Sequence, residues 1–327
     1  MVPRVRKSAG FASILLTRGL ALALILGLWA QLCWSGSLRY CESDQVLSTA
    51  DQDRLIRVAA IVKTELERSG QSIALLARSG LDLQRFDQRY SHAGVSLKDS
   101  PNTAWSVRQL YYACDEQRPR IFDQGMSGFV LGVNDPAEGY ISIVLLPSEA
   151  ATALQQAAMD DRRALQVLGS SYSANAYPFS QQYQNCNQWV AEMMAAAWTL
   201  LPPGDIPRRQ AQQWLMEQGY TPSVISLGWR PLMWLADQVH WLHSDDHPPE
   251  DIEAAQFTVS MPSSLESFVR KLLPQATHVE LCYTRQYLVI RRSWEPIAPG
   301  CIPGDGDEVS KLVGETAVQG LPVAVAQ

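Results

Sequence analysis

The sequence predicts an α+β protein, and three observations lead to this class. An amphipathic segment over residues 48–69 predicts a helix, short apolar or alternating segments after it predict strands, and an amphipathic segment after Cys186 predicts another helix. Strands that are grouped between helices are typical of the α+β class. The chain has 327 residues and no internal repeat, which suits one large domain, alone or with an extension.

The first helix and the first strand have clear boundaries in the sequence. Ser48 or Thr49 is a suitable N-cap for the helix over 48–69, and Gly70 ends it. A short apolar strand is expected at residues 73–77. These two elements begin the core of the predicted domain.

A strand that carries one histidine follows at residues 90–97. Alternation places His92 on one face of this strand, together with Tyr90, Gly94 and Ser96. The small residues in this set leave space beside the imidazole, where the end of a helix can approach closely. The alternative is a histidine that is satisfied within the core, which is the commoner role of a lone histidine on a strand.

The next strand offers this histidine a partner. Turn-forming residues at 98–102 separate it from a strand over 105–112, which suggests a hairpin. One face of the second strand carries Trp105, Val107, Gln109 and Tyr111. We therefore expect Gln109 to lie across from His92, where it can orient the ring through the second ring nitrogen. The alternative for Gln109 is a polar side chain that faces solvent.

Cys186 lies at the start of an amphipathic segment. Apolar residues recur at helical spacing over 187–199, and Pro202 and the residues after it end the helix. Unpaired N–H groups and the helix dipole at this position are expected to lower the pKa of the thiol and to stabilise an oxyanion. The alternative is a small buried side chain that packs against the start of the helix.

The remaining elements follow from the same patterns. A buried strand is expected at 139–146, one helix or two within 149–169, and a polar, aromatic loop at 172–182. Further helices are expected at 206–218 and 231–241. A β-α-β-β group follows, with strands at 257–261, 278–283 and 287–294 and a helix at 263–273, which begins with a capping box of Ser263 and Glu266. This group can complete the main sheet or stand apart from it.

Two short segments carry a resemblance to known proteins. YSHAGV at 90–95 and QNCNQW at 184–189 resemble the circularly permuted branch of the NlpC-type, papain-like superfamily, which includes lecithin:retinol acyltransferase-like proteins and bacterial cell-envelope hydrolases. In that branch the histidine precedes the cysteine. More narrowly, most of residues 38–300 resembles a bacterial family of secreted proteins of unknown function, through these motifs and the segments 78–83, 107–112, 122–125 and 172–177.

The resemblance implies a fold and a set of roles. The fold is a permuted papain-like core, an antiparallel sheet with the cysteine helix packed on it, followed by the C-terminal β-α-β-β extension. Cys186 matches the nucleophile, His92 the general base and Gln109 the third polar position, where other members more often have His, Glu, Asp or Asn. The main-chain N–H of Cys186, with Asn185 or Asn187, would stabilise the oxyanion. The expected domains are 38–225 for the core, 226–303 for the extension and 304–327 for a flexible tail.

The amino terminus predicts export. Residues 1–37 begin with basic residues, continue with an apolar stretch over 19–34 and end in small residues, which is the pattern of a secretory signal. The apolar stretch is short for a membrane span, although an uncleaved anchor in the inner membrane remains an alternative. We therefore expect an exported protein, in the periplasm of a Gram-negative bacterium.

The cysteines are consistent with an oxidising compartment. Five remain after the signal is removed, and an odd number leaves one free if the others pair. The most economical assignment joins Cys41 to Cys114 and Cys282 to Cys301, which leaves Cys186 unpaired, although four cysteines allow three pairings.

Charge and composition narrow the choice of partners. Without residues 1–37, which hold four basic and no acidic residues, the net charge changes from −6 to −10, so nucleic acid is a poor candidate. A group of histidines and carboxylates could hold a metal, but its spacing matches no known motif; its members are His240, His243, Asp245, Asp246, His247, Glu250 and Asp251. We expect no metal and no cofactor.

Two functions from different classes follow. The first is an exported cysteine-dependent hydrolase or acyltransferase that acts on an amide or ester, with cell-wall peptides as the favoured substrate. The second is a non-catalytic envelope protein that binds a peptide, glycan or lipid on the same fold. Either would use an aromatic-lined cleft, for which the candidates are Tyr90, Trp105, Tyr183 and Trp189.

Overall fold

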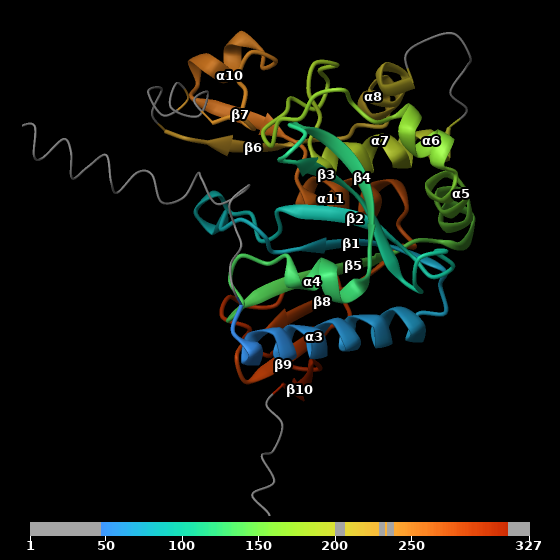
Figure 1. The fold of residues 1–327 in the computed structure, drawn as a ribbon, viewed down its shortest axis with the longest axis vertical. Coiled ribbons are helices and arrows are strands. Elements are labelled where there is room, and N and C mark those ends of the chain that lie inside the picture. The colour runs from blue at the N-terminus through green and yellow to red at the C-terminus, as the bar shows by residue number, and fades with distance from the viewer. Residues whose placement is uncertain (1–46, 200–206, 229–232, 234–238, 313–327) are drawn as a thin grey trace, which may run out of the picture. The chain divides into compact units, whose positions relative to one another are not determined.

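A computed structural model describes residues 47–199, 207–228, 233 and 239–312. Within this part of the chain, eight antiparallel strands form one sheet with helices on both faces (Figure 1). The strand order is β10-β9-β8-β5-β1-β2-β3-β4. The strands are β1 (Ile73–Arg78), β2 (His92–Leu97), β3 (Ser106–Ala113), β4 (Arg118–Gln124), β5 (Gly139–Leu145), β8 (Thr277–Tyr283), β9 (Tyr287–Arg291) and β10 (Glu308–Lys311). The predicted α+β class is confirmed.

One face of the sheet is covered by α3 (Thr49–Arg68) and α4 (Met126–Leu131). Their apolar side chains form one hydrophobic core with alternate residues of the strands, such as Leu76 of β1 and Ile141 of β5. The predicted cap of α3 is confirmed, since Ser48 Oγ accepts a hydrogen bond from the N–H of Asp51 at 3.1 Å. Burial of this apolar surface is the main force that holds the layer on the sheet.

Helices α5 (Ser148–Met159), α7 (Cys186–Trp198) and α11 (Pro262–Leu272) form the layer on the opposite face. Leu75 and Ala77, which alternate with Leu76 along β1, meet α11 here. The shorter helices are α6 (Asp161–Gln166), α8 (Pro207–Glu217), α10 (Pro249–Glu253) and the single turn η1 (Gln84–Phe86). The cysteine helix therefore packs on an antiparallel sheet, the coarse arrangement that the resemblance implies.

The C-terminal segment differs from the prediction. Strand β7 (Gln256–Val259) pairs with β6 (Ser223–Ser226) in a separate two-stranded sheet, whereas β8 and β9 join the main sheet beside β5. The β-α-β-β group is therefore divided between two sheets. Within the predicted flexible tail 304–327, Glu308–Lys311 form strand β10, which pairs with β9, and residues 313–327 lie outside the described residues. Strands β4 and β10 and helix α4 have no counterpart among the predicted elements.

The capping box of α11 is not formed. The helix begins one residue earlier than predicted, at Pro262, with Met261 at the N-cap position. Ser263 Oγ instead donates to Oε1 of Gln88 at 2.7 Å. Proline is favoured in the first turn of a helix because its missing N–H would be unpaired there in any case. The carboxyl group of Glu266 lies against the sheet rather than at the helix start.

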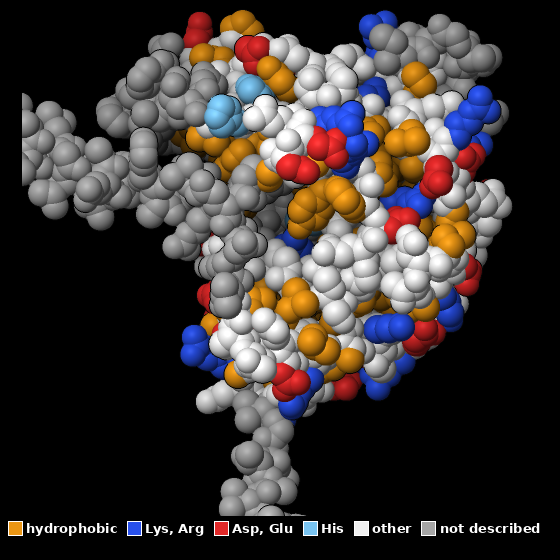
Figure 2. Space-filling view, viewed as in Figure 1, with side chains coloured by type: hydrophobic (Ala, Val, Ile, Leu, Met, Phe, Trp, Pro, Cys, Tyr) orange, Lys and Arg blue, Asp and Glu red, His pale blue; other side chains and the backbone are white. Residues whose placement is uncertain are grey.

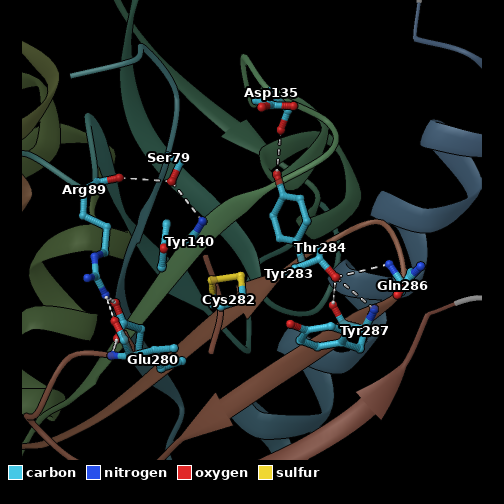
Figure 3. Close-up of a disulfide and its surroundings, with 12 residues drawn as sticks. Ser79, Arg89, Asp135, Tyr140, Glu280, Cys282, Tyr283, Thr284, Gln286 and Tyr287 are labelled. Carbon is cyan, nitrogen blue, oxygen red and sulfur yellow. Dashed lines mark hydrogen bonds and ion pairs between the residues drawn. A yellow bond between two sulfur atoms is a disulfide. The ribbon is translucent and has the colours of Figure 1, made fainter. Parts of the chain in front are cut away.

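The predicted disulfide between Cys282 and Cys301 is confirmed. It fixes the segment that follows β9 against β8, next to Glu280 and Tyr283 (Figure 3). Cys114 is also disulfide-bonded, and its predicted partner, Cys41, lies outside the described residues. Cys186 is the free cysteine of the part of the chain that the structure describes.

Two other predictions fall largely or wholly on residues that the structure does not describe. These are the signal over residues 1–37 and the helix over 231–241. Among the helices in the described ranges, none has the length and apolar character required to span a bilayer.

Candidate functional site

Strands β2 and β3 pair over only part of their length, and the start of α7 lies where they separate. The two strands pair from Val95 to Leu97 of β2. Before Val95, the open edge of β2 faces α7: Asn187 Nδ2 donates to the carbonyl of Ser91 at 3.3 Å, and Cys186 Sγ lies 4.0 Å from the same oxygen. The main-chain N–H of Ala93 also faces Sγ. Cys186 therefore contacts the main chain on both sides of His92.

Gly94 lies at the point of separation. A Cβ atom there would be 2.6 Å from Val107 Cγ1 and 3.0 Å from the carbonyl oxygen of Arg108. The first distance is shorter than real Cβ contacts and the second is at the tight end of them, so a larger residue at this position would push β3 away from β2. The space that the sequence predicts beside the imidazole is thus filled by β3 rather than by the end of the helix.

Cys186 is the first residue of α7. Asn185 is its N-cap, because Asn185 Oδ1 accepts a hydrogen bond from the N–H of Gln188 at 2.7 Å. Asn185 Nδ2 donates to the carbonyls of Ala174 and Ser260, both at 3.2 Å. The position that the sequence predicts for Cys186, at the mouth of a helix, is therefore confirmed, and the amide of Asn185 is fully used in holding the helix start.

Asn187 also holds the helix start. Its Nδ2 donates to Ser260 O at 3.1 Å in addition to Ser91 O, and its Oδ1 accepts from the thiol of Cys186 at 3.6 Å. The amide groups of both predicted oxyanion helpers, Asn185 and Asn187, are thus bonded to main-chain carbonyls. The main-chain N–H groups that face Sγ are the donors that remain for an oxyanion.

The thiol of Cys186 is protonated at neutral pH in this structure. Burial raises its pKa to about 11, and this effect outweighs the N–H groups of Asn187 and Ala93 and the charge of Arg78, which lower it. The side chain is 5% exposed. The sequence predicts a lowered pKa from the position at a helix start, and the structure corrects this because desolvation of the thiolate is the larger effect.

His92 is held in one tautomer by a chain of two glutamines. His92 Nε2 lies 2.6 Å from Gln109 Oε1, and Gln109 Nε2 donates to Gln124 Oε1 of β4 at 2.7 Å. With this assignment of the amide, Gln109 Oε1 can only accept, so Nε2 of His92 carries the proton and Nδ1 has a free lone pair. The predicted neighbourhood of His92 and Gln109 is therefore present in the structure.

The imidazole is neutral at physiological pH. Burial, together with the charge of Arg78, lowers the pKa of His92 to about 3, while the hydrogen bond to Gln109 acts to raise it. The ring is 7% exposed and lies near Tyr111 and Phe129. No hydrogen bond joins His92 to Cys186, two residues that the structure describes fully. The pair is thus a neutral thiol and a neutral imidazole separated by the edge of β2.

The four predicted cleft aromatics do not line one cleft. Trp105 and Trp189 are fully buried, and their indole N–H groups donate to Glu67 Oε1 at 2.6 Å and to the carbonyl of Ala164 at 3.3 Å. Tyr90 is buried and donates to Glu280. Tyr183 stacks on His243 with ring centroids 4.3 Å apart. Large aromatic residues serve the core more often than a site, and alternation alone does not distinguish the two roles.

The histidine- and carboxylate-rich segment contacts the loop that leads to Cys186. His247 Nε2 lies 2.7 Å from the carbonyl oxygen of Asn175, and His247 Nδ1 lies 3.4 Å from Asp251 Oδ2. Asp246 accepts from the N–H of Tyr177 at 2.9 Å. The described residues contain no group of three or more His, Cys, Asp or Glu arranged to hold a metal. In this structure the segment anchors a loop.

Two residues of the site are not identified by the sequence reasoning. Arg78 pairs with His92 across β1 and β2, and Gln124 holds Gln109 from β4. Both belong to segments that carry the narrow family resemblance, 78–83 and 122–125, but a sequence position does not show which strand faces which. Their roles depend on the pairing of strands, which the sequence pattern leaves open.

A comparison with family models gives one match. Residues 65–269 match the model of a family described as "Uncharacterized protein conserved in bacteria (DUF2145)". No curated protein and no solved structure matched the chain. The matched range contains β1 to β7 and α7, and so all of the residues described above around Cys186 and His92.

Proposed function

The chain belongs to the DUF2145 family of bacterial proteins, and on this premise we propose that it is an exported cysteine-dependent hydrolase or acyltransferase. The proposed fold is a circularly permuted papain-like core. Cys186 is the nucleophile, His92 the general base, and Gln109 the residue that orients His92. The substrate is an amide or ester of the cell envelope, with a cell-wall peptide favoured over a glycan or a lipid.

The proposed reaction begins from the neutral pair. Nδ1 of His92 takes the proton of the thiol as Sγ attacks the carbonyl carbon, so that a C–S bond forms and the carbonyl electrons move to oxygen. The N–H groups near Sγ stabilise that oxyanion. The intermediate collapses with cleavage of the C–N or C–O bond, and His92 returns the proton to the leaving amine or alcohol. Water or a second acceptor then releases the acyl group.

The observation that carries the proposal is the geometry of His92. Gln124 orients Gln109, Gln109 fixes the Nε2–H tautomer of His92, and the free cysteine of the described chain contacts the main chain on both sides of that histidine. Nδ1 of that histidine keeps a free lone pair, which a general base requires. Nucleophile, base and orienting group are thus supplied by α7, β2 and β3.

The rings of Phe122, Tyr111 and His92 form a series from the surface to the site. Phe122 of β4 is 47% exposed and meets the ring of Tyr111 edge to face, with centroids 6.1 Å apart. Tyr111 in turn lies 5.3 Å from the ring of His92. Figure 2 shows hydrophobic side chains on the surface of this view, with basic and acidic side chains interspersed among them. An uncharged acyl group suits such a surface better than a polyanion does.

The test uses p-nitrophenyl acetate as an acyl donor. Intact-mass and peptide mass spectrometry should find one acetyl group on Cys186, with release of p-nitrophenol in a burst. His92→Ala should slow the burst by about 100-fold or more, which is the usual contribution of a general base. Cys186→Ser is the matched control for background acetylation. Equal acetylation of wild type and His92→Ala would exclude the Cys–His mechanism.

A non-catalytic binding protein is the second candidate, and one observation favours it. Both reacting groups are buried and held in their neutral forms, with pKa values of about 11 and about 3. A protein that only binds a peptide, glycan or lipid requires no ionised thiol. In that case p-nitrophenyl acetate would leave Cys186 unmodified in the folded protein, and Cys186→Ser would not alter its affinity for envelope fragments.

A further inference from the structure

Arg78 ends β1 directly across from His92. The residue is only 3% exposed, and its guanidinium lies over the ring of Phe129, with Cζ 5.3 Å from the centroid. Its Nη1 donates to the carbonyls of Gly132 and Ser79, and its Nη2 lies 3.4 Å from the hydroxyl of Tyr111. All of these partners are neutral oxygens, and the buried Nε has no partner.

The charge of Arg78 is not neutralised by any acidic residue in the described chain. Two other buried arginines do have acidic partners: Arg208 lies 2.9 Å from Glu192, and Arg108 lies 2.6 Å from Asp123. A buried cation without a counter-charge is unfavourable by several kcal/mol in general. The fold therefore keeps a positive charge beside His92 at a cost in stability, and the charge is available to an anion that forms during a reaction.

The space for this guanidinium is provided by two glycines. A Cβ atom at Gly132 would lie 2.5 Å from Nη2 of Arg78, and a Cβ at Gly80 would lie 2.5 Å from Ser91 Oγ and 3.0 Å from Nη1 of Arg78. Neither glycine has a positive φ, so neither is required by its backbone conformation. Their effect is to let the chain close around the guanidinium and hold it in place.

The groups that face this charge are the reacting groups of the site. The charge of Arg78 acts on His92 of β2, Cys186 of α7 and Tyr283 of β8, and burial raises the pKa of Tyr283. The hydroxyl of Tyr111 on β3 lies 3.4 Å from Nη2 of Arg78. The positive charge disfavours an imidazolium and favours a thiolate or an oxyanion. In a Cys–His ion pair the positive charge that stabilises the thiolate is the imidazolium, whereas here the histidine stays neutral.

We propose that Arg78 is the cation of this site, which stabilises the negative charge that develops on Cys186 and on the carbonyl oxygen of the substrate. This inference rests on the proposed function, because it assigns a residue to the same reaction. Arg78 neither gives nor takes a proton. It allows His92 to act as a neutral base while the negative charge remains compensated.

The test measures the rate of alkylation of Cys186 by iodoacetamide at several pH values. Arg78→Met removes the charge and should slow labelling about tenfold at each pH, which corresponds to one unit in the pKa of the thiol. Arg78→Lys keeps a charge and should restore most of the rate. Tyr111→Phe is the matched control, since it removes a hydrogen bond of Arg78 without removing charge. Circular dichroism checks that each variant is folded.

A second variant serves if Arg78→Met does not fold. Tyr111→Glu leaves Arg78 in place and gives it a carboxylate partner, so labelling of Cys186 should slow as it does in Arg78→Met. If Arg78→Met or Tyr111→Glu is folded and its Cys186 is labelled as fast as in wild type, the role of Arg78 is overturned.

The acetylation assay separates the two proposals. If labelling of Cys186 depends on Arg78 but p-nitrophenyl acetate does not acetylate Cys186, the electrostatic role of Arg78 is supported and the proposed enzyme activity is refuted. If acetylation depends on His92 but not on Arg78, the proposed enzyme activity is supported and the role of Arg78 is refuted.

Discussion

Gln109 on β3 accepts a hydrogen bond from Nε2 of His92 on β2 over 2.6 Å, and this contact determines which nitrogen of the ring is free. Gln109 is itself fixed from β4 by Gln124. Three consecutive strands thus orient one imidazole. A carboxylate orients the histidine in thiol and serine enzymes, whereas the two glutamines here orient the ring without adding negative charge.

Substitution of Gln109 should separate orientation from charge. Gln109→Leu should slow acetylation of Cys186 by about 10- to 100-fold, because the ring loses its fixed tautomer. Gln109→Glu keeps an acceptor and adds a carboxylate, which should raise the pKa of His92 from its low value of about 3. The imidazole resonances of His92, followed by NMR against pH, report that shift. An unchanged titration in Gln109→Glu would contradict the assigned contact.

The pH dependence of alkylation should show no plateau near neutrality. With a thiol pKa of about 11, the thiolate fraction grows about tenfold per pH unit through the neutral range. The rate of labelling of wild-type Cys186 by iodoacetamide should follow that slope. The same protein unfolded in urea is the control, since its thiol has an ordinary pKa. A plateau between about pH 6 and pH 8 in the folded protein would reveal a thiolate–imidazolium pair instead.

Stability should fall as pH rises through the titration of Glu266. Burial, together with the charge of Glu280, raises the pKa of this carboxyl group from 4.5 to about 7. The folded state therefore holds the proton more tightly than the unfolded state, so stability is full below pH 4.5 and declines up to about pH 7. The loss is expected to be about 2 kcal/mol in urea unfolding, because the side chain retains some solvent contact.

The variant Glu266→Gln tests that assignment. It should remove most of the decline between pH 4.5 and about pH 7, because the amide does not titrate. The matched control is Glu253→Gln, which changes an exposed glutamate of α10 and should leave the decline in place. If the two variants have the same pH dependence, Glu266 is not the group responsible.

The ion pair of Glu192 and Arg208 should support the helix that carries Cys186. Glu192 of α7 is fully buried and accepts from Arg208 Nε at 2.9 Å and from the amides of Gln184 and Gln212 at 2.6 and 2.8 Å. Arg208→Met leaves a buried carboxylate without its cation and should lower the free energy of unfolding by about 3 to 5 kcal/mol. Glu192→Gln combined with Arg208→Met should recover part of that loss.

An exposed pair provides the comparison. Arg57 and Asp53 of α3 lie 2.6 Å apart with both side chains largely in solvent. Arg57→Met should change the free energy of unfolding by less than about 1 kcal/mol in the same urea experiment. Equal effects of Arg57→Met and Arg208→Met would show that burial of the second pair is not what makes it important.

Much of the local structure follows from the sequence. The helix that begins after Ser48, the strand that carries His92 and the helix that begins at Cys186 lie where hydrophobic periodicity and capping residues place them. These features depend on residues close in the chain, which is why pattern reasoning finds them. The capping box of Ser263 and Glu266 was a wrong prediction, because Pro262 begins the helix and the carboxyl group of Glu266 packs on the sheet.

The division of the C-terminal strands could not be predicted. The pattern around β7, β8 and β9 shows that strands exist, but not which edge each one pairs with, because every exposed strand edge offers the same N–H and C=O groups. Next to the pairing of β10 with β9, Arg291 and Asp307 form an ion pair over 2.7 Å, a long-range contact that the composition of a tail rich in glycine and acidic residues does not reveal.

At the site, local periodicity is sufficient to place Cys186 at the start of a helix and His92 and Gln109 on neighbouring strands, because it sets the face and the end of each element. The protonation states of Cys186 and His92, in contrast, depend on the assembled fold. The pKa values of Cys186 and His92 follow from how completely the layers bury them and from Arg78, which strand pairing brings next to His92. Burial and cross-strand neighbours are properties of the assembled sheet, and no segment of the chain encodes them alone.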